Sequence, residues 1–313
     1  MNTYAIIVTY NPPAGFLDKL DNLRAQIDQL VIVDNGSKPE ICDSFRQIAS
    51  QNEEHIEFIF NKGNSGIAIA LNQGFAWAIE RNADFVFAFD QDSQPAPGMV
   101  ATVFGTFVSH PRREQVAIVA PVVEDPTAGI VLRYVQSRGL IFYRRMHLAN
   151  QVLNDISAVI TSGALYNLQV YRKIGPFRDD FFMDYVDTEY CLRAKQCGYT
   201  IVVNCNAHLY HRLGNQQKRS IGLLTTFPTF HSVLRWYYIS RNRVLMYELY
   251  GLRFPHWLLY ELVVNSKGLI RLLFFEDQKI NKLLAILLGT IDGIAQHMGP
   301  ISDSRKTLIK AHQ

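Results

Sequence analysis

The first 90 residues alternate short apolar segments with segments whose apolar residues recur at helical spacing. This alternation predicts strands and intervening helices, the strands at 4–10, 29–37, 56–61 and 83–90 and the helices at 14–29, 39–51 and 66–81. Apolar strands that alternate with helices pack as a parallel sheet covered on both faces. The sequence therefore predicts an α/β fold with a mostly parallel central sheet flanked by helices.

The regular alternation stops after residue 115. The later patterns predict a strand, an antiparallel excursion, a strand and helix ending at Gly175, another helix and a last strand, at 115–123, 131–145, 156–175, 181–199 and 200–214. Residues 226–300 carry much Leu, Tyr and Phe in segments that resemble helices. We therefore expect a helical C-terminal region behind the α/β part.

Polar motifs follow each of the four predicted N-terminal strands. They are Thr9-Tyr10-Asn11, Asp34-Asn35-Gly36-Ser37, Asn61 to Gly66, and Asp90-Gln91-Asp92. In open α/β sheets, ligands bind beyond the carboxyl ends of the strands. The four motifs should therefore meet at one edge of the sheet, and this convergence is stronger evidence for a site than any single motif.

Asp90 and Asp92 place two carboxylates near one point at the end of a buried strand. Such a pair suits a hard divalent cation, Mg²⁺ or Mn²⁺, which also binds phosphate oxygens. The alternative is a turn that ends the strand before Pro95 and Pro97.

The segment NKGNSGIAIALNQGF, 61–75, places three glycines and three asparagines around a helix start. Gly-rich backbone at a helix N-terminus can approach an anion or a sugar closely. The alternative is a plain turn with Ser65 as the helix cap. Asp34 leaves a similar choice, between a contact to a nucleobase or ribose and a turn-forming role.

The segment MDYVDTEYCLRAK carries Asp184 and Asp187, which would share one face of a helix. Mutual repulsion can raise the pKa of one of them, and such a carboxylate can deprotonate a hydroxyl. The alternative is that these acids complement the helix dipole. His208 and His211 could bind a metal, contact a diphosphate or simply lie in a loop.

The charge is unevenly distributed. Residues 1–211 have a net charge of −5 and residues 212–313 a net charge of +8. In the tail, Trp236, Tyr237 and Tyr238 lie among basic residues, a combination that suits an interface with anionic lipid. The basic residues are Arg235, Arg241 and Arg243. The alternative is a tail that packs against the core or forms a dimer.

Taken in order, these motifs resemble the family 2 inverting glycosyltransferases of the GT-A fold. The resemblance covers about residues 3–215 and also includes Thr161-Ser162-Gly163, Asp187-Thr188-Glu189 with Arg193, and His211 with Gly214. The sequence around Asp90 and Asp187 is most similar to that of bacterial rhamnosyltransferases that assemble cell-surface polysaccharides such as O-antigen. Many relatives carry Glu-Asp at the position of Val186-Asp187, so Asp187 lacks the acidic neighbour that those relatives have.

The resemblance implies a role for each motif. Asp187 would be the catalytic base, and Asp92, Asp90 and His211 would hold Mg²⁺ or Mn²⁺. The donor, with dTDP-rhamnose as the first expectation, would be bound by Thr9, Tyr10, Asn11, Asp34, Asn35, Lys62, Asn64, Gly66, Asn72, Asp90, Gln91 and His211. The acceptor would be a glycan or a lipid-linked saccharide, and no nucleic-acid partner is expected.

We expect residues 1–215 to form the catalytic domain, with the donor half at about 1–115 and the acceptor half at about 116–215. Residues 216–313 would form a helical region that contacts a membrane surface or a second copy of the chain. These expectations place the protein in the cytoplasm, peripherally on the inner face of the cell membrane. One alternative is a transferase of the same fold that uses another UDP, GDP or dTDP sugar. The other is a nucleotidyltransferase, but TYNPPAG after the first strand lacks the basic residues that such an enzyme would need there.

Overall fold

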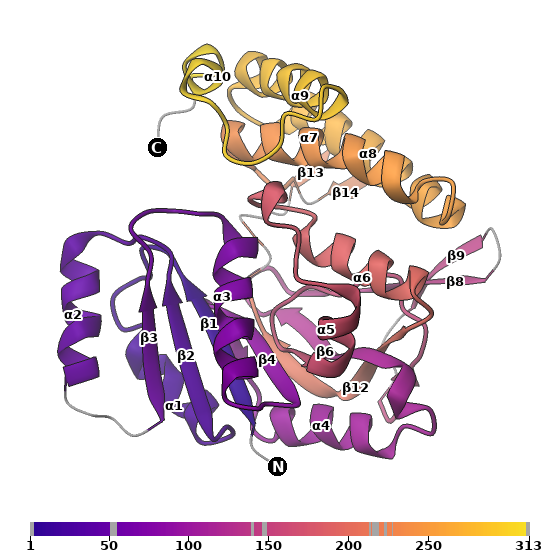
Figure 1. Ribbon diagram of the computed structural model, residues 1–313. Coiled ribbons are helices and arrows are strands. Elements are labelled where there is room, and N and C mark those ends of the chain that lie inside the picture. Colours follow the sequence, from indigo (N-terminus) through magenta and orange to yellow (C-terminus); the bar gives the residue numbers. More distant parts are fainter. Residues whose placement is uncertain are drawn as a thin grey trace.

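The computed structural model describes residues 3–50, 55–138, 141–145, 149–212, 214, 219–221, 224–226 and 228–310. A central sheet is flanked by helices, and four C-terminal helices gather at one end of the molecule (Figure 1). The predicted mostly parallel sheet and the helical C-terminal region are both confirmed. The domain boundary predicted between residues 215 and 216 lies outside the described residues.

Four parallel strands form the N-terminal half of the sheet, in the order β3-β2-β1-β4. They are β1 (Tyr4–Thr9), β2 (Gln29–Asp34), β3 (Ile56–Phe60) and β4 (Phe85–Asp90). Alternate residues of β1 enter different apolar clusters. Ile6 packs with α3 (Ile67–Glu80), and Ile7 packs in the cluster that contains Phe45 of α2 (Pro39–Ser50). Helices thus cover both faces, and the carboxyl ends of the four strands share one edge.

The predicted helix at 14–29 is much shorter in the structure. Only a 3₁₀ helix at Leu17–Leu20 and one turn, α1 (Asp21–Arg24), form there. The Asn22 side chain instead donates to the backbone oxygen of Pro95 (2.7 Å), and the Asp28 carboxylate accepts from the backbone N–H of Thr3 (2.6 Å). These contacts redirect the chain into β2.

The second half of the sheet mixes strand directions. β6 (Val116–Asp125) and β12 (Thr200–Tyr210) are parallel, and β11 (Ala164–Asn167) runs antiparallel between β4 and β6. The predicted excursion is the antiparallel hairpin of β8 (Tyr134–Arg138) and β9 (Ile141–Arg145). The remaining elements here are β5 (Gln94–Pro95), α4 (Met99–Ser109), a 3₁₀ helix at Arg113–Gln115, β7 (Ile130–Val131), β10 (Val152–Leu153), α5 (Leu168–Ile174), a 3₁₀ helix at Asp179–Phe181, β13 (Arg219–Ile221) and β14 (Leu224–Thr226).

The helix predicted at 181–199 begins later than expected. The observed helix, α6, spans Val186–Gln196, because Phe182, Asp184 and Tyr185 just before it have positive φ angles of 64°, 57° and 63°. Residues in that left-handed region cannot continue a helix. Asp184 therefore lies in a loop, and the prediction that it shares a helix face with Asp187 is wrong.

The C-terminal helices are α7 (Val233–Tyr250), α8 (Pro255–Phe275), α9 (Lys279–Ile294) and α10 (Asp303–Leu308). α9 lies against α7 at Gly289, where an added Cβ would come within 2.3 Å of the backbone oxygen of Tyr237. In the described part of the chain, none of the helices combines the length and apolarity needed to cross a bilayer.

One of the interpretations that the sequence leaves open is that the aromatic and basic residues of α7 meet lipid. The structure contradicts this for most of them, because Trp236, Tyr237, Tyr238 and Arg241 are all buried. Aromatic residues and arginines spaced along a helix fit a core as well as a lipid interface when the guanidinium has backbone carbonyls to bind. For α7, the core-packing alternative is the correct one.

Candidate active site

The ends of β1 and β4 are tied together by a side chain. Gln91 accepts a hydrogen bond from the backbone N–H of Tyr10 (2.8 Å) and donates one to the backbone oxygen of Tyr10 (3.3 Å). Asp90 is the last residue of β4, so the same connection places its carboxylate at the predicted edge of the sheet. The strand ends therefore converge as the sequence predicted.

Asp90, Asp92 and His211 form a cluster at this edge. Their potential ligand atoms all lie within 4.8 Å of one another. His211 Nδ1 is 3.1 Å from Asp92 Oδ1, and His211 Nε2 is 3.6 Å from Asp90 Oδ2. The two carboxylate side chains are 40% and 45% exposed, so a ligand can reach them from solvent.

His211 enters the cluster from the end of β12. Its backbone N–H donates to the oxygen of Glu124 (2.9 Å), and its Nδ1 lies 2.9 Å from the hydroxyl of Ser93. Burial alone lowers the pKa of His211, but the hydrogen bond to Asp92 and the charges of both aspartates outweigh it, so the pKa is raised. His208 is not part of the cluster, because its Nδ1 pairs with Glu124 Oε1 (2.6 Å).

Two carboxylates and an imidazole fit a divalent cation. Carboxylate oxygens are ligands that Mg²⁺ and Mn²⁺ prefer, and such ions usually complete their shell with water and substrate phosphate. The backbone N–H of Asp90 donates to the Ser162 hydroxyl (3.0 Å), which fixes the end of β4. The cluster is thus braced by neighbouring hydroxyls and open on its solvent side.

Asp34 and Thr9 are fully buried beneath this edge. Asp34 Oδ1 accepts from the backbone N–H groups of Gly36 (3.2 Å) and Ser37 (2.9 Å), and Oδ2 accepts from the Thr9 hydroxyl (3.1 Å). Asp34 therefore shapes the turn after β2, as the turn-forming alternative expected. A direct contact from Asp34 or Thr9 to a nucleotide stays a prediction.

Asn35 connects this turn to the loop after β3. Its amide donates to Asn64 Oδ1 (3.2 Å) and to the backbone oxygen of Gly66 (3.2 Å), and its own oxygen accepts from Asn61 and Ser65 (both 3.1 Å). The predicted donor residues that lie exposed or partly exposed above this frame are Tyr10, Asn11, Lys62, Asn64 and Gln91.

Gly66 and Asn72 connect α3 to the acceptor half. At Gly66 φ is +90°, and an added Cβ would lie 2.6 Å from the backbone oxygen of Phe182. The Asn72 side chain donates to the backbone oxygen of Phe177 (2.9 Å) and accepts from the Tyr171 hydroxyl (2.9 Å). Both residues hold the two halves together, and a contact to the donor stays a prediction for them.

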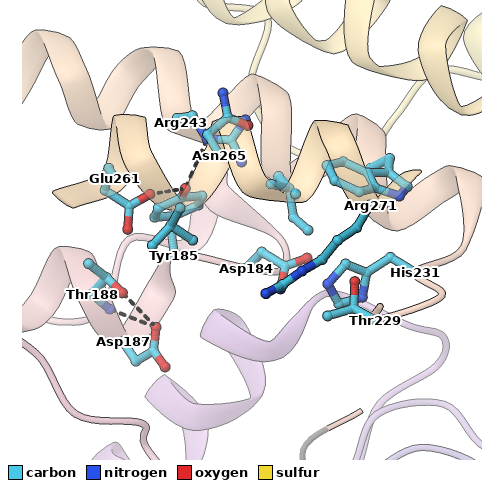
Figure 2. Close-up of a pocket in the computed structure, with 14 residues that line it drawn as sticks. Asp184, Tyr185, Asp187, Thr188, Thr229, His231, Arg243, Glu261, Asn265 and Arg271 are labelled. Carbon is cyan, nitrogen blue, oxygen red and sulfur yellow. Dashed lines mark hydrogen bonds between the residues drawn. The ribbon is translucent and has the colours of Figure 1, made fainter. Parts of the chain in front are cut away.

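Asp187 lies in the first turn of α6 and lines a cavity of about 320 Å³. Its Oδ1 accepts from the backbone N–H of Thr188 (2.7 Å), as Figure 2 shows. Burial raises the pKa of Asp187 to about 6 against the opposing effect of that N–H, and the charges of Asp184 and Asp90 contribute in the same direction. A carboxyl group with this pKa is suited to take a proton near neutral pH.

Sequence reasoning missed the side-chain contacts at and beside this cavity. Arg235 pairs with Asp184 (2.9 Å), and the Tyr185 hydroxyl lies between Glu261 and Arg243 (Figure 2). These partners come from α7 and α8, between 51 and 76 residues away in the chain. No local spacing signal could have paired them.

A model of glycosyl transferase family 2 matches residues 4–175, which is more than half of the chain. The chain belongs to glycosyl transferase family 2. This confirms the resemblance, and the protein is a nucleotide-sugar glycosyltransferase. The dTDP-rhamnosyl transferase RfbF of Shigella flexneri is 29% identical over 301 residues, which cover 94% of this glycosyltransferase and 95% of that protein.

Solved structures share the fold of this glycosyltransferase. TarS of S. aureus, residues 1–349, has a TM-score of 0.53 at 12% identity and covers 95% of this chain and 82% of its own. GalNAc-T7, solved with UDP, GalNAc and Mn²⁺, has a TM-score of 0.55 at 12% identity, and the match covers 68% of this chain and 44% of that one. These likenesses confirm the predicted GT-A fold.

Proposed function

We propose that this glycosyltransferase moves L-rhamnose from dTDP-rhamnose, with inversion, to a glycan or lipid-linked saccharide in cell-surface polysaccharide biosynthesis. The observation that supports the sugar is the similarity to RfbF, which extends over 94% of the chain and so includes the C-terminal helices. Membership of family 2 favours sugar transfer over the rival nucleotidyltransferase activity. Another nucleotide sugar remains the alternative donor.

In the proposed mechanism, Asp187 accepts the proton of an acceptor hydroxyl. The hydroxyl oxygen forms a bond to the anomeric carbon while the bond from that carbon to the diphosphate oxygen breaks, and the electron pair leaves with the nucleotide diphosphate. A single in-line displacement inverts the anomeric centre and needs no protein nucleophile. A divalent ion bound by Asp90, Asp92 and His211 would supply positive charge to the departing diphosphate.

We expect dTDP-rhamnose to stabilise the protein against thermal unfolding only when Mn²⁺ or Mg²⁺ is present. At a ligand concentration 100 times its Kd, the free energy of unfolding should rise by about 2.7 kcal/mol. Asp92→Ala should remove this gain because it deletes one of the three predicted ligands. Differential scanning fluorimetry with a panel of dTDP-, UDP- and GDP-sugars measures the effect.

The matched control is Glu80→Ala, an exposed acidic residue at the end of α3. It should keep the full metal-dependent gain. Equal stabilisation in excess chelator, or in Asp92→Ala, would contradict the metal site. A larger gain with a different nucleotide sugar would replace dTDP-rhamnose as the donor.

We also propose that the glycosyltransferase lies peripherally on the cytoplasmic face of the membrane, through α8 and α9 instead of α7. The solvent-facing side of α8 carries apolar residues at helical spacing, namely Leu259, Leu262, Val263, Ile270, Leu273 and Phe274. A similar row on α9 consists of Ile280, Leu283, Leu287, Ile291 and Ile294. Phe274 is 70% exposed and Ile280 is 82% exposed, so much of these rows faces solvent in the described chain.

Charge supports a lipid surface as the occupant. Arg253, Lys267 and Lys279 are exposed on or beside these helices, and residues 212–313 have a net charge of +8. Exposed apolar rows with flanking cations match the interface between acyl chains and anionic headgroups. Residues 216–313 would therefore bind the membrane surface through both the exposed apolar rows and the flanking cations.

The double variant Ile270→Glu/Phe274→Glu should lower binding to vesicles with 30% phosphatidylglycerol by at least about tenfold, because burying each apolar side chain contributes about 1.5–3 kcal/mol. Sedimentation with vesicles measures this. Val108→Glu is the control, since Val108 is an exposed apolar residue on α4, at the opposite end of the molecule (Figure 1). Unchanged vesicle binding would contradict the proposal, and a dimer that the double variant dissociates would assign the rows to a second copy.

A further inference from the structure

The inner side of α8 carries both apolar and polar residues, because the buried Trp257 and Leu272 pack into the protein while polar residues between them line a cavity. The solvent-facing side of this helix is mostly apolar, whereas Glu261, Asn265, Gly268 and Arg271 on the other side line the cavity next to α6 and α7. A helix packed against a protein core normally turns its apolar face inward. The polar residues on the inner side of α8 therefore face the cavity, where a polar ligand could reach them.

Residues of α8 and the predicted catalytic base line the same cavity. Asp187 and Glu261 both line it, and its volume of about 320 Å³ lies within the range of small-molecule sites. Trp236 and Ile239 provide an apolar wall, and the side chain of Arg271 points from α8 into the space (Figure 2). Apolar walls with a few polar groups around a base are features that would suit a sugar ring.

Among the described residues, two oxygen atoms on the inner face of α8, Glu261 Oε1 and Asn265 Oδ1, are left for a ligand. The Tyr185 hydroxyl donates to Glu261 Oε2 (2.7 Å), and Arg243 Nε donates to that hydroxyl (3.1 Å), so Glu261 is fixed through one oxygen. Asn265 Oδ1 is buried and has no hydrogen-bond partner among the described residues. A buried acceptor without a donor is costly, and a ligand hydroxyl would relieve that cost.

We propose that this cavity binds the terminal sugar of the acceptor, with Glu261 and Asn265 accepting hydrogen bonds from hydroxyls that do not react. The reacting hydroxyl then faces Asp187. This inference rests on the proposed function and assigns its acceptor site. α8 lies outside residues 4–175, the part that matches the family model, so acceptor choice is built on a helix that the family model does not cover.

The test uses octyl glycosides of rhamnose, N-acetylglucosamine and galactose as acceptor probes, with the one that the wild type glycosylates fastest taken further. Glu261→Gln keeps the shape of the side chain, and Asn265→Ala removes the unpartnered oxygen. Each should raise the KM for the probe by about 5- to 100-fold, the effect of losing one ligand hydrogen bond. The metal-dependent stabilisation by the donor should stay unchanged in both variants.

The control is Ser266→Ala, on the exposed side of the same helix. A wild-type KM for the probe in both Glu261→Gln and Asn265→Ala would overturn the proposal. Saturation-transfer NMR from the protein to the probe gives a second measurement, which should weaken in both variants and would overturn the proposal if it did not. A failure of the proposed function shows differently, as loss of donor stabilisation in the wild type.

Discussion

Asp187→Asn should lower kcat by about 10²–10⁴-fold, the contribution that a positioned general base typically makes. The amide keeps the size of the side chain but cannot take the acceptor proton. Because donor recognition is assigned to the strand ends, metal-dependent stabilisation by dTDP-rhamnose should stay at the wild-type level. Initial rates with a saturating probe acceptor, together with thermal shifts, separate the two effects.

The pH dependence provides a second readout of the same residue. With the pKa of Asp187 raised to about 6, the wild-type rate should rise as the pH increases through that value and level off above it, since only the carboxylate can accept a proton. Asp187→Asn should abolish this rise. Asp179→Asn, at an exposed aspartate nearby, is the control and should keep it. Turnover in Asp187→Asn close to the wild-type rate would remove the base assignment.

The strand ends could be predicted because their signals are local. Each apolar strand runs directly into its polar motif, so Asp90 and Asp92 could be placed at the edge of the sheet from neighbouring residues alone. His211 was placed there only by the resemblance, since it follows a different strand, β12. Its 3.1 Å approach to Asp92 depends on the parallel pairing of β12 with β6, which no short segment of the sequence specifies.

The errors in α6 and α7 have one common cause. Arg241 and Asn242 of α7 point into the protein and bind backbone oxygens of the loop before α6. Arg241, which suggested a lipid interface, therefore helps to shape the active site instead. Helix propensity correctly predicted that both segments are helical. The direction of their polar side chains depended on carbonyl groups about 60 residues away, which periodicity does not contain.

Asn242 makes the contacts that hold this loop. Its amide donates to the backbone oxygens of Phe181 (3.0 Å), Met183 (2.7 Å) and Asp184 (3.0 Å), and its own oxygen accepts from Arg241 Nε (3.0 Å). The side chain is fully buried. These donors stabilise the left-handed conformations that direct the chain into α6, so Asn242 positions Asp187 without contacting it.

Asn242→Leu should lower the free energy of unfolding by about 2–5 kcal/mol, because it leaves buried carbonyl oxygens without donors at about 1–3 kcal/mol each. The relaxed loop should admit water to Asp187, which moves the midpoint of the pH–rate profile below 6 and lowers kcat. Urea unfolding and the pH profile measure the two effects. Ser240→Ala is the matched control on the same helix, since the buried Ser240 hydroxyl has no described partner and its loss should change neither measurement. If Asn242→Leu is destabilised but the midpoint of its pH–rate profile is unshifted, Asn242 has a purely structural role. A shifted midpoint would show that the C-terminal helices influence the pKa of the base.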